Sequence, residues 1–157
     1  MTDQYQLLPE WAPQEAVMLV WPDTKTDWHP WLQKVQEVYL TIITALNLAN
    51  TNVILLVRTE SKEHCKSLLP NTAKILIVTA EYNDTWIRDY GFLSCSSGHK
   101  MQPIEFEFNG WGNKFKATED NQVNQKVLSQ LCQSPIEPAN FVLEGGAIEI
   151  DQHGTLL

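Results

Sequence analysis

Three short apolar runs in the first half of the chain have the length and composition of buried strands. They are Val17–Trp21, Val53–Val57 and Ile75–Thr79. Each is rich in aliphatic residues and is bounded by polar residues or proline, which is typical of a strand in a protein core. The pattern therefore predicts three buried strands.

The segments between these runs predict two helices. Pro30 suits a first helical turn, and Asn50–Asn52 ends the pattern that follows it. The apolar residues at helical spacing are Trp31, Val35, Val38, Ile42, Ala45 and Ala49. The second predicted helix is short: Ser61 is expected to cap it, it runs through Leu69, and Pro70–Asn71 ends it.

The second half of the chain mixes strands with one helix. Residues 92–95 and 103–108 are predicted strands, joined by a polar hairpin loop that begins at Ser96, and a helix is predicted over 120–132. The last predicted elements are short strands over 141–143 and 147–150, a turn over 151–154 and a returning strand from 155. Helices combined with antiparallel hairpins predict a mixed α/β fold rather than a purely parallel sheet.

Composition narrows the class of protein. Apolar residues make up 43% of the chain and charged residues 19%, as in one globular domain, and no apolar run approaches the roughly 18–20 residues of a membrane span. The N-terminus lacks the regions of a secretory signal, and three cysteines form no disulfide framework, so we expect a cytoplasmic protein. A net charge of −8 argues against binding to nucleic acid or to anionic membranes.

The densest group of polar and aromatic side chains follows the third apolar run, in Asn83–Gly91. Here Asp89 lies between Trp86 and Tyr90 in the sequence. A carboxylate after a buried strand can bind a cation, and best a planar guanidinium, because two oxygens match two N–H donors. Trp86 can stack on the same cation or on an alkyl chain. Alternatively, Asp89 pairs with Arg88 or another basic group and fixes a loop, and the local sequence leaves both interpretations open.

Two further segments also have open interpretations. Glu144 precedes Gly145–Gly146, which can adopt positive φ or approach a ligand closely, so Glu144 either points into a cleft or stands solvated beside a glycine bulge. The turn Phe108–Lys114 forms either a lid or substrate wall, or a plain loop in which Trp111 packs as a plug.

The histidines and cysteines lack the spacing of a metal site or a catalytic triad. The histidines, predicted to lie in turns or on exposed helix, are His29, His64, His99 and His153. The cysteines, interpreted as small core residues, are Cys65, Cys95 and Cys132. Nucleotide-binding glycine motifs are also missing from the sequence, so we predict neither a metal nor a nucleotide cofactor.

Four segments form an ordered set of motifs. They are Pro9–Trp11 with Glu15–Ala16 and Trp21–Pro22, then Asn83–Gly91, Phe108–Lys114 and Leu143–Thr155. Together they resemble the agmatine deiminase and bacterial peptidylarginine deiminase family, within the guanidino-group-modifying superfamily, over almost all 157 residues. The sequence departs from the family at Phe92, where proline is common, and at Gln14, where histidine is common.

The resemblance implies a fold, a reaction and residue roles. The family fold is the pentein, a five-bladed αβ-propeller, of which this chain would form roughly the first half. Family members hydrolyse a guanidinium to a ureido group and ammonia: a cysteine thiolate attacks, a histidine moves protons and two acidic residues hold the nitrogens. Asp89 matches the acidic residue that grips the guanidinium, Trp86 a substrate-lining aromatic residue, and Glu144 a second acidic contact. The implied substrate is agmatine, converted without a cofactor to N-carbamoylputrescine on the way from arginine to putrescine.

The catalytic histidine and cysteine of the family fall at positions after Leu157. We therefore expect residues 1–157 to be the N-terminal portion of a single catalytic domain, inactive as a deiminase on its own. Part of a propeller would expose strand edges and apolar faces, so we expect the chain either to self-associate, as a homo-oligomer, or to be marginally stable. Two alternatives are open: a peptidylarginine deiminase, and a non-catalytic module that binds amines or a partner chain.

Overall fold

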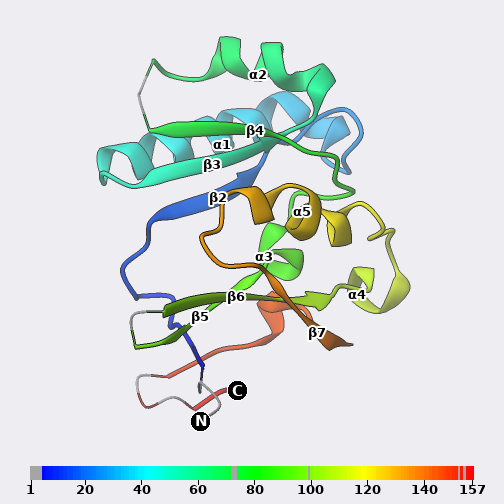
Figure 1. Ribbon diagram of the computed structural model, residues 1–157. Helices are drawn as coiled ribbons and strands as arrows, with labels where there is room; N and C mark the ends of the chain where they lie inside the picture. Colours follow the sequence, from blue (N-terminus) through cyan, green and yellow to red (C-terminus); the bar gives the residue numbers. More distant parts are fainter. Residues whose placement is uncertain (1–4, 72–73, 99, 152, 154) are drawn as a thin grey trace. The chain divides into compact units, whose positions relative to one another are not determined.

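The computed structural model describes residues 5–71, 74–98, 100–151, 153 and 155–157 (Figure 1). The chain divides into two compact units. Pro13–Ile87 forms the first, which we call the parallel-sheet unit; the chain up to Ala12 together with Arg88–Leu157 forms the second, the mixed-sheet unit.

The parallel-sheet unit is built on three strands, β2 (Ala16–Val20), β3 (Asn52–Val57) and β4 (Ile75–Thr79). They lie in the order β2-β3-β4 and every pair is parallel. The 3₁₀ turn η1 (His29–Trp31) and helix α1 (Leu32–Leu48) connect the first two strands, and η2 (Thr59–Ser61) with α2 (Lys62–Leu68) connects the next two (Figure 1). The predicted strands and helices of this half are therefore confirmed.

One face of this sheet carries the core of the parallel-sheet unit. Val53, Leu55 and Val57 alternate along β3 and so point to the same side. On that side they pack with Ile43 of α1 and Cys65 of α2, and all five are buried. Both helices therefore cover the same face of the sheet.

The mixed-sheet unit contains a four-stranded sheet in the order β1-β5-β6-β7. Its strands are β1 (Gln6–Leu7), β5 (Leu93–Ser97), β6 (Lys100–Glu107) and β7 (Glu137–Val142). The first two pairs are antiparallel and β6–β7 is parallel. Its helical segments are α3 (Ile87–Tyr90), α4 (Gly110–Asn113), α5 (Asp120–Lys126), η3 (Leu128–Gln130) and η4 (Gly145–Ala147). One parallel and one mixed sheet confirm the mixed α/β prediction.

Several predicted boundaries are wrong. The strand expected over 147–150 is shorter than predicted, because η4 extends through Ala147. Its second part is paired with the predicted returning segment: Glu149 and Leu157 exchange two backbone hydrogen bonds, and Ile150 forms an antiparallel bridge with Leu156. The expected helix 120–132 ends at Lys126, because Val127 leaves the helical region (φ −121°, ψ −61°) and a 3₁₀ turn follows. The strand expected over 141–143 begins earlier, at Glu137.

Two local predictions also need correction. Ser61 stands at the N-cap position of α2 but makes no side-chain cap bond; its hydroxyl lies 3.4 Å from a carboxylate oxygen of Asp23 instead. The β5–β6 pairing extends further than expected, because it continues to Ser97 and Lys100, which were assigned to the polar loop. Two positions of the predicted turn 151–154, residues 152 and 154, lie outside the described residues, and Asp151 Oδ1 accepts hydrogen bonds from the amides of His153 and Thr155.

No helix within the described residues is both long enough and apolar enough to cross a lipid bilayer.

Candidate functional site

Asp89 lies on α3 and its carboxylate is fixed by the glycine pair. Its Oδ1 accepts a hydrogen bond of 3.1 Å from the backbone N–H of Gly146, 57 residues further along the chain. The contact joins the Asn83–Gly91 segment to the glycine pair that follows Glu144, two predicted site segments that lie far apart in the sequence. Asp89 itself is half-buried, so one part of the carboxylate meets the protein and another part meets solvent.

Close packing explains both glycines of this pair. A Cβ atom on Gly145 would lie 2.2 Å from the carbonyl oxygen of Arg88, and a Cβ atom on Gly146 would lie 2.3 Å from Asp89 Oδ1. Neither residue has positive φ. Of the two roles considered for these glycines, the structure therefore supports close approach, here to α3 and the Asp89 side chain. Both glycines belong to η4, which overlaps the predicted strand 147–150 only at Ala147.

The basic neighbour of Asp89 has another partner. The guanidinium of Arg88 forms an ion pair of 2.6 Å with Glu10, and both side chains are largely exposed. Among the residues that the structure describes, no ion pair involves Asp89. The interpretation that Asp89 pairs with Arg88 is therefore wrong, although Asp89 does hold a loop through the Gly146 amide.

Glu144 directly precedes η4. Its side chain is half-buried, and its carbonyl accepts a hydrogen bond of 2.9 Å from the amide of Ala147. The structure thus positions Glu144 two residues from the amide that holds Asp89, in the same unit.

The aromatic turn of the mixed-sheet unit has an uncommon backbone. Gly110, Trp111, Gly112 and Asn113 all have positive φ, from 55° to 76°. A left-handed turn costs about 1–2 kcal/mol for each residue other than glycine, so the surroundings must hold Trp111 in place. Its ring packs edge-to-face against Phe108 at 4.9 Å and Phe115 at 5.6 Å. This packing agrees with the interpretation of Trp111 as a plug.

Trp86 belongs to the parallel-sheet unit, in the segment that follows β4. Its side chain is 51% exposed. Its ring lies against that of Trp28, with centroids 6.2 Å apart and planes tilted by 42°. Trp28 was not predicted as a site residue; its aromatic character in the polar segment after Pro22 is the signal that could have indicated it.

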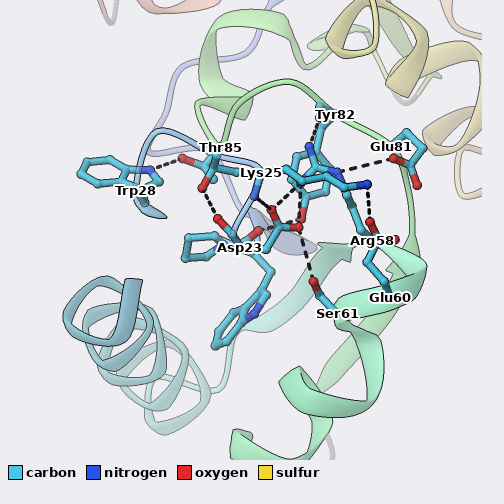
Figure 2. A network of polar contacts seen from close by, with 12 residues as sticks. Asp23, Lys25, Trp28, Arg58, Glu60, Ser61, Glu81, Tyr82 and Thr85 are labelled. Atoms are coloured by element: carbon cyan, nitrogen blue, oxygen red, sulfur yellow. Dashed lines mark hydrogen bonds and ion pairs between the residues drawn. The ribbon is translucent and has the colours of Figure 1, made fainter. Parts of the chain in front are cut away.

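A buried ion pair at the carboxyl ends of the parallel strands was also missed. Asp23 follows β2, Arg58 follows β3 and Tyr82 follows β4. One guanidinium nitrogen of Arg58 donates to both oxygens of Asp23 at 2.7 Å, and the guanidinium lies over the Tyr82 ring, 4.1 Å from its centroid (Figure 2). Asp23 and Arg58 are only 4% and 3% exposed. The edge where α/β sheets place ligand sites is here occupied by the protein's own guanidinium.

The described histidines and the cysteines lack the environment of a nucleophile or a metal site. His29, His64 and His153 are exposed, and His99 lies outside the described residues. Burial raises the pKa of Cys65 to about 12 and also raises the pKa of Cys95 and of Cys132, which disfavours the reactive thiolate. Within the described part of the chain, no group of three or more potential ligands could hold a metal.

Comparison with known proteins identifies the class. Residues 6–157 match the Porphyromonas-type peptidyl-arginine deiminase family, and the chain belongs to this family of deiminases. Among its relatives is the agmatine deiminase of Pseudomonas syringae pv. tomato, which is 30% identical over 163 residues that cover 99% of this chain and 43% of the relative.

Solved agmatine deiminases resemble the chain in structure as well. The C315S enzyme of C. jejuni with substrate bound superposes with a TM-score of 0.87 at 29% identity, covering 98% of this chain and 45% of that protein. The enzyme of Enterococcus faecalis gives a TM-score of 0.85 at 27% identity, covering 97% and 42% respectively. The chain thus spans less than half the length of these relatives.

Proposed function

We propose that this chain is the substrate-binding, N-terminal portion of an agmatine deiminase. The complete enzyme would hydrolyse the guanidinium of agmatine to N-carbamoylputrescine and ammonia, in the formation of putrescine from arginine. The observation that carries the proposal is the Asp89 carboxylate, which the Gly146 amide orients and which no ion pair among the described residues neutralises.

The chemistry of the substrate explains why such a carboxylate is needed. A guanidinium is a resonance-stabilised cation that resists nucleophilic attack, so the enzyme must orient it before a covalent step can divide the barrier. With Oδ1 held by Gly146, the Asp89 carboxylate has a defined direction from which to accept N–H donors of a guanidinium. We assign Glu144 as the second acidic contact and Trp86 as a substrate-lining aromatic side chain.

The nucleophile and the proton-transferring histidine would lie outside residues 1–157. The three cysteines present are poor nucleophiles, because burial raises the pKa of each thiol. We therefore propose that the chain alone binds agmatine without converting it. The reaction would need no cofactor and would take place in the cytoplasm. The chain would form the first part of a single catalytic domain with the pentein propeller fold. The exposed side chains of Phe141 and Val142, on edge strand β7, favour homo-oligomers, which light scattering would detect.

Calorimetric titration of the purified chain with agmatine tests the proposed site. Asp89→Asn keeps an oxygen that can accept from Gly146 but removes the charge, and loss of a charge-assisted pair should weaken binding by about 10- to 100-fold. Glu37→Gln removes one charge from an exposed position of α1 and should leave binding unchanged. Equal affinity of the wild-type chain and Asp89→Asn would rule out this role for Asp89.

A peptidylarginine deiminase is the second candidate, because the family is described as the peptidyl-arginine type. The two candidates differ in the group attached to the guanidinium. A titration with an arginine-containing peptide, run beside agmatine, distinguishes them: tighter binding of the peptide would favour the second candidate.

A further inference from the structure

Two tryptophan rings of the parallel-sheet unit touch in a way that limits what either can bind. Trp28 precedes η1 and Trp86 follows β4, and their ring centroids are 6.2 Å apart with planes tilted by 42°. A cation or alkyl chain between two aromatic faces needs nearly parallel planes about 7–8 Å apart, because each contact layer takes about 3.5–4.0 Å. The two rings therefore leave no room for a ligand between them.

Trp28 thus supports one side of the Trp86 ring. The Trp86 side chain is still 51% exposed, so it retains surface on which a cation could stack. A tilted pair at this distance is a favourable aromatic contact. One side of the Trp86 ring therefore contacts Trp28, and another part of the side chain is open to solvent.

Trp28 is itself fixed by a hydrogen bond to the residue before Trp86. Its indole Nε1–H donates to the hydroxyl of Thr85 at 2.8 Å, across 57 residues of sequence (Figure 2). Thr85 is only 7% exposed, and its backbone N–H donates to the Asp84 carboxylate at 2.6 Å. Because Trp86 is bonded directly to Thr85, this hydrogen bond limits movement of the backbone that carries the Trp86 ring.

The other end of the same segment is held by the buried ion pair. The Arg58 guanidinium donates to the carbonyl of Tyr82 while Asp23 neutralises it, and the Tyr82 hydroxyl donates to the carbonyl of Trp21 at 2.7 Å. Figure 2 shows Arg58, Tyr82, Thr85 and Trp28 in one network of polar contacts. Residues 82–85 are therefore anchored at both ends.

We propose that Trp28 is a positioning residue for Trp86: its ring contact and its hydrogen bond to Thr85 hold the Trp86 indole ready to stack on the substrate cation. This rests on the proposed function, which assigns Trp86 to the substrate. A ring that is already ordered loses less side-chain entropy when a ligand binds. Loss of Trp28 should therefore weaken binding without abolishing it.

The order of the Trp86 ring can be measured directly. The chain has six tryptophans, so 5-fluorotryptophan labelling gives ¹⁹F resonances that Trp→Phe variants assign, with Trp86→Phe identifying the resonance of Trp86. Trp28→Phe removes the N–H donor, and Thr85→Val removes its acceptor at nearly constant volume. Both should shift or broaden the Trp86 resonance. Trp31→Phe, at an exposed position of η1, is the matched control and should leave it unchanged.

Calorimetry with agmatine then connects this order to binding. Trp28→Phe and Thr85→Val should each weaken binding by about two- to tenfold, the range expected from one hydrogen bond. Thr85→Ser, unlike Thr85→Val, keeps the hydroxyl and should bind agmatine with wild-type affinity. This comparison separates a positioning role from a general loss of folding.

The results distinguish this proposal from the proposed function. An unchanged Trp86 resonance in both Trp28→Phe and Thr85→Val overturns the positioning role, as does a changed resonance with unchanged agmatine affinity. If the wild-type chain binds no agmatine, the proposed function fails, and the ¹⁹F resonance alone then decides whether Trp28 positions Trp86.

Discussion

The two adjacent glycines at the Asp89 site should respond to the same substitution in different ways. In Gly146→Ala the new methyl group would lie 2.3 Å from Asp89 Oδ1, whereas in Gly145→Ala it would lie 2.2 Å from the backbone carbonyl oxygen of Arg88. Neither position has positive φ, so the backbone conformation itself adds no penalty for alanine. The difference lies in what can move.

A carboxylate can rotate away from the new methyl group, but a backbone carbonyl of α3 cannot. Gly146→Ala should therefore displace Asp89 by about 1 Å, enough to restore an ordinary contact of roughly 3.5 Å. The hydrogen bond from the Gly146 amide would be lost, which at this exposed position should cost about 1 kcal/mol of unfolding free energy. Agmatine binding should weaken by about tenfold or more, because the orientation of the carboxylate is lost.

Gly145→Ala should instead destabilise the fold. Overpacking against fixed atoms costs about 1–3 kcal/mol, and a rigid carbonyl at 2.2 Å places this variant at the upper end. A loss of about 3 kcal/mol would lower the melting temperature by roughly 6–12 °C for a chain of this size.

Urea unfolding followed by tryptophan fluorescence, together with calorimetry on the folded variants, measures both effects. Gly98→Ala is a useful control, since a Cβ there meets no atom within 4 Å and the positive φ of 62° alone sets its cost, about 1–2 kcal/mol. Wild-type agmatine affinity in Gly146→Ala, or wild-type stability in Gly145→Ala, would refute the packing argument.

Two further predictions concern the parallel-sheet unit. Arg58→Met leaves the buried Asp23 carboxylate without its partner, so it should lower the unfolding free energy measured in urea by about 3–5 kcal/mol. The double variant Asp23→Leu/Arg58→Met should recover part of this loss. Equal stability of the single and the double variant would contradict the ion-pair argument. Burial raises the pKa of Cys65 from its ordinary 9.0 to about 12, so the folded state keeps a proton that the unfolded state loses. The stability that this thiol contributes is fully present below pH 9 and is lost as the pH rises towards 12. The unfolding free energy of Cys65→Ala should therefore fall less over this range than that of the wild-type chain. Identical pH profiles of the two proteins would disprove a raised pKa for Cys65.

Hydrophobic patterning was sufficient to predict most of the strands and helices of the parallel-sheet unit. The predicted strands at residues 17–21, 53–57 and 75–79 agree with β2, β3 and β4 to within one residue at each end. The long predicted helix is likewise confirmed as α1. These elements are encoded locally, because aliphatic runs and helical spacing depend on neighbours in the sequence.

Patterning failed where a distant contact outweighed a local preference. The strand predicted from residue 147 begins later, because η4 extends over Gly145–Ala147, where both glycines lie close to α3. Serine is a common N-cap residue, yet the Ser61 hydroxyl lies near the Asp23 carboxylate instead of capping α2. In each case the deciding atom belongs to another part of the chain.

The sequence by itself determined most of the element types, the family and the candidate residues Asp89, Trp86 and Glu144, because strand patterns and ordered motifs are properties of short segments. Only the tertiary structure decided the partners of these residues. It showed that Asp89 is held by Gly146 and Trp86 by Trp28, each contact spanning tens of residues. Such contacts depend on how closely two backbones approach, a distance that a linear pattern of residues does not contain.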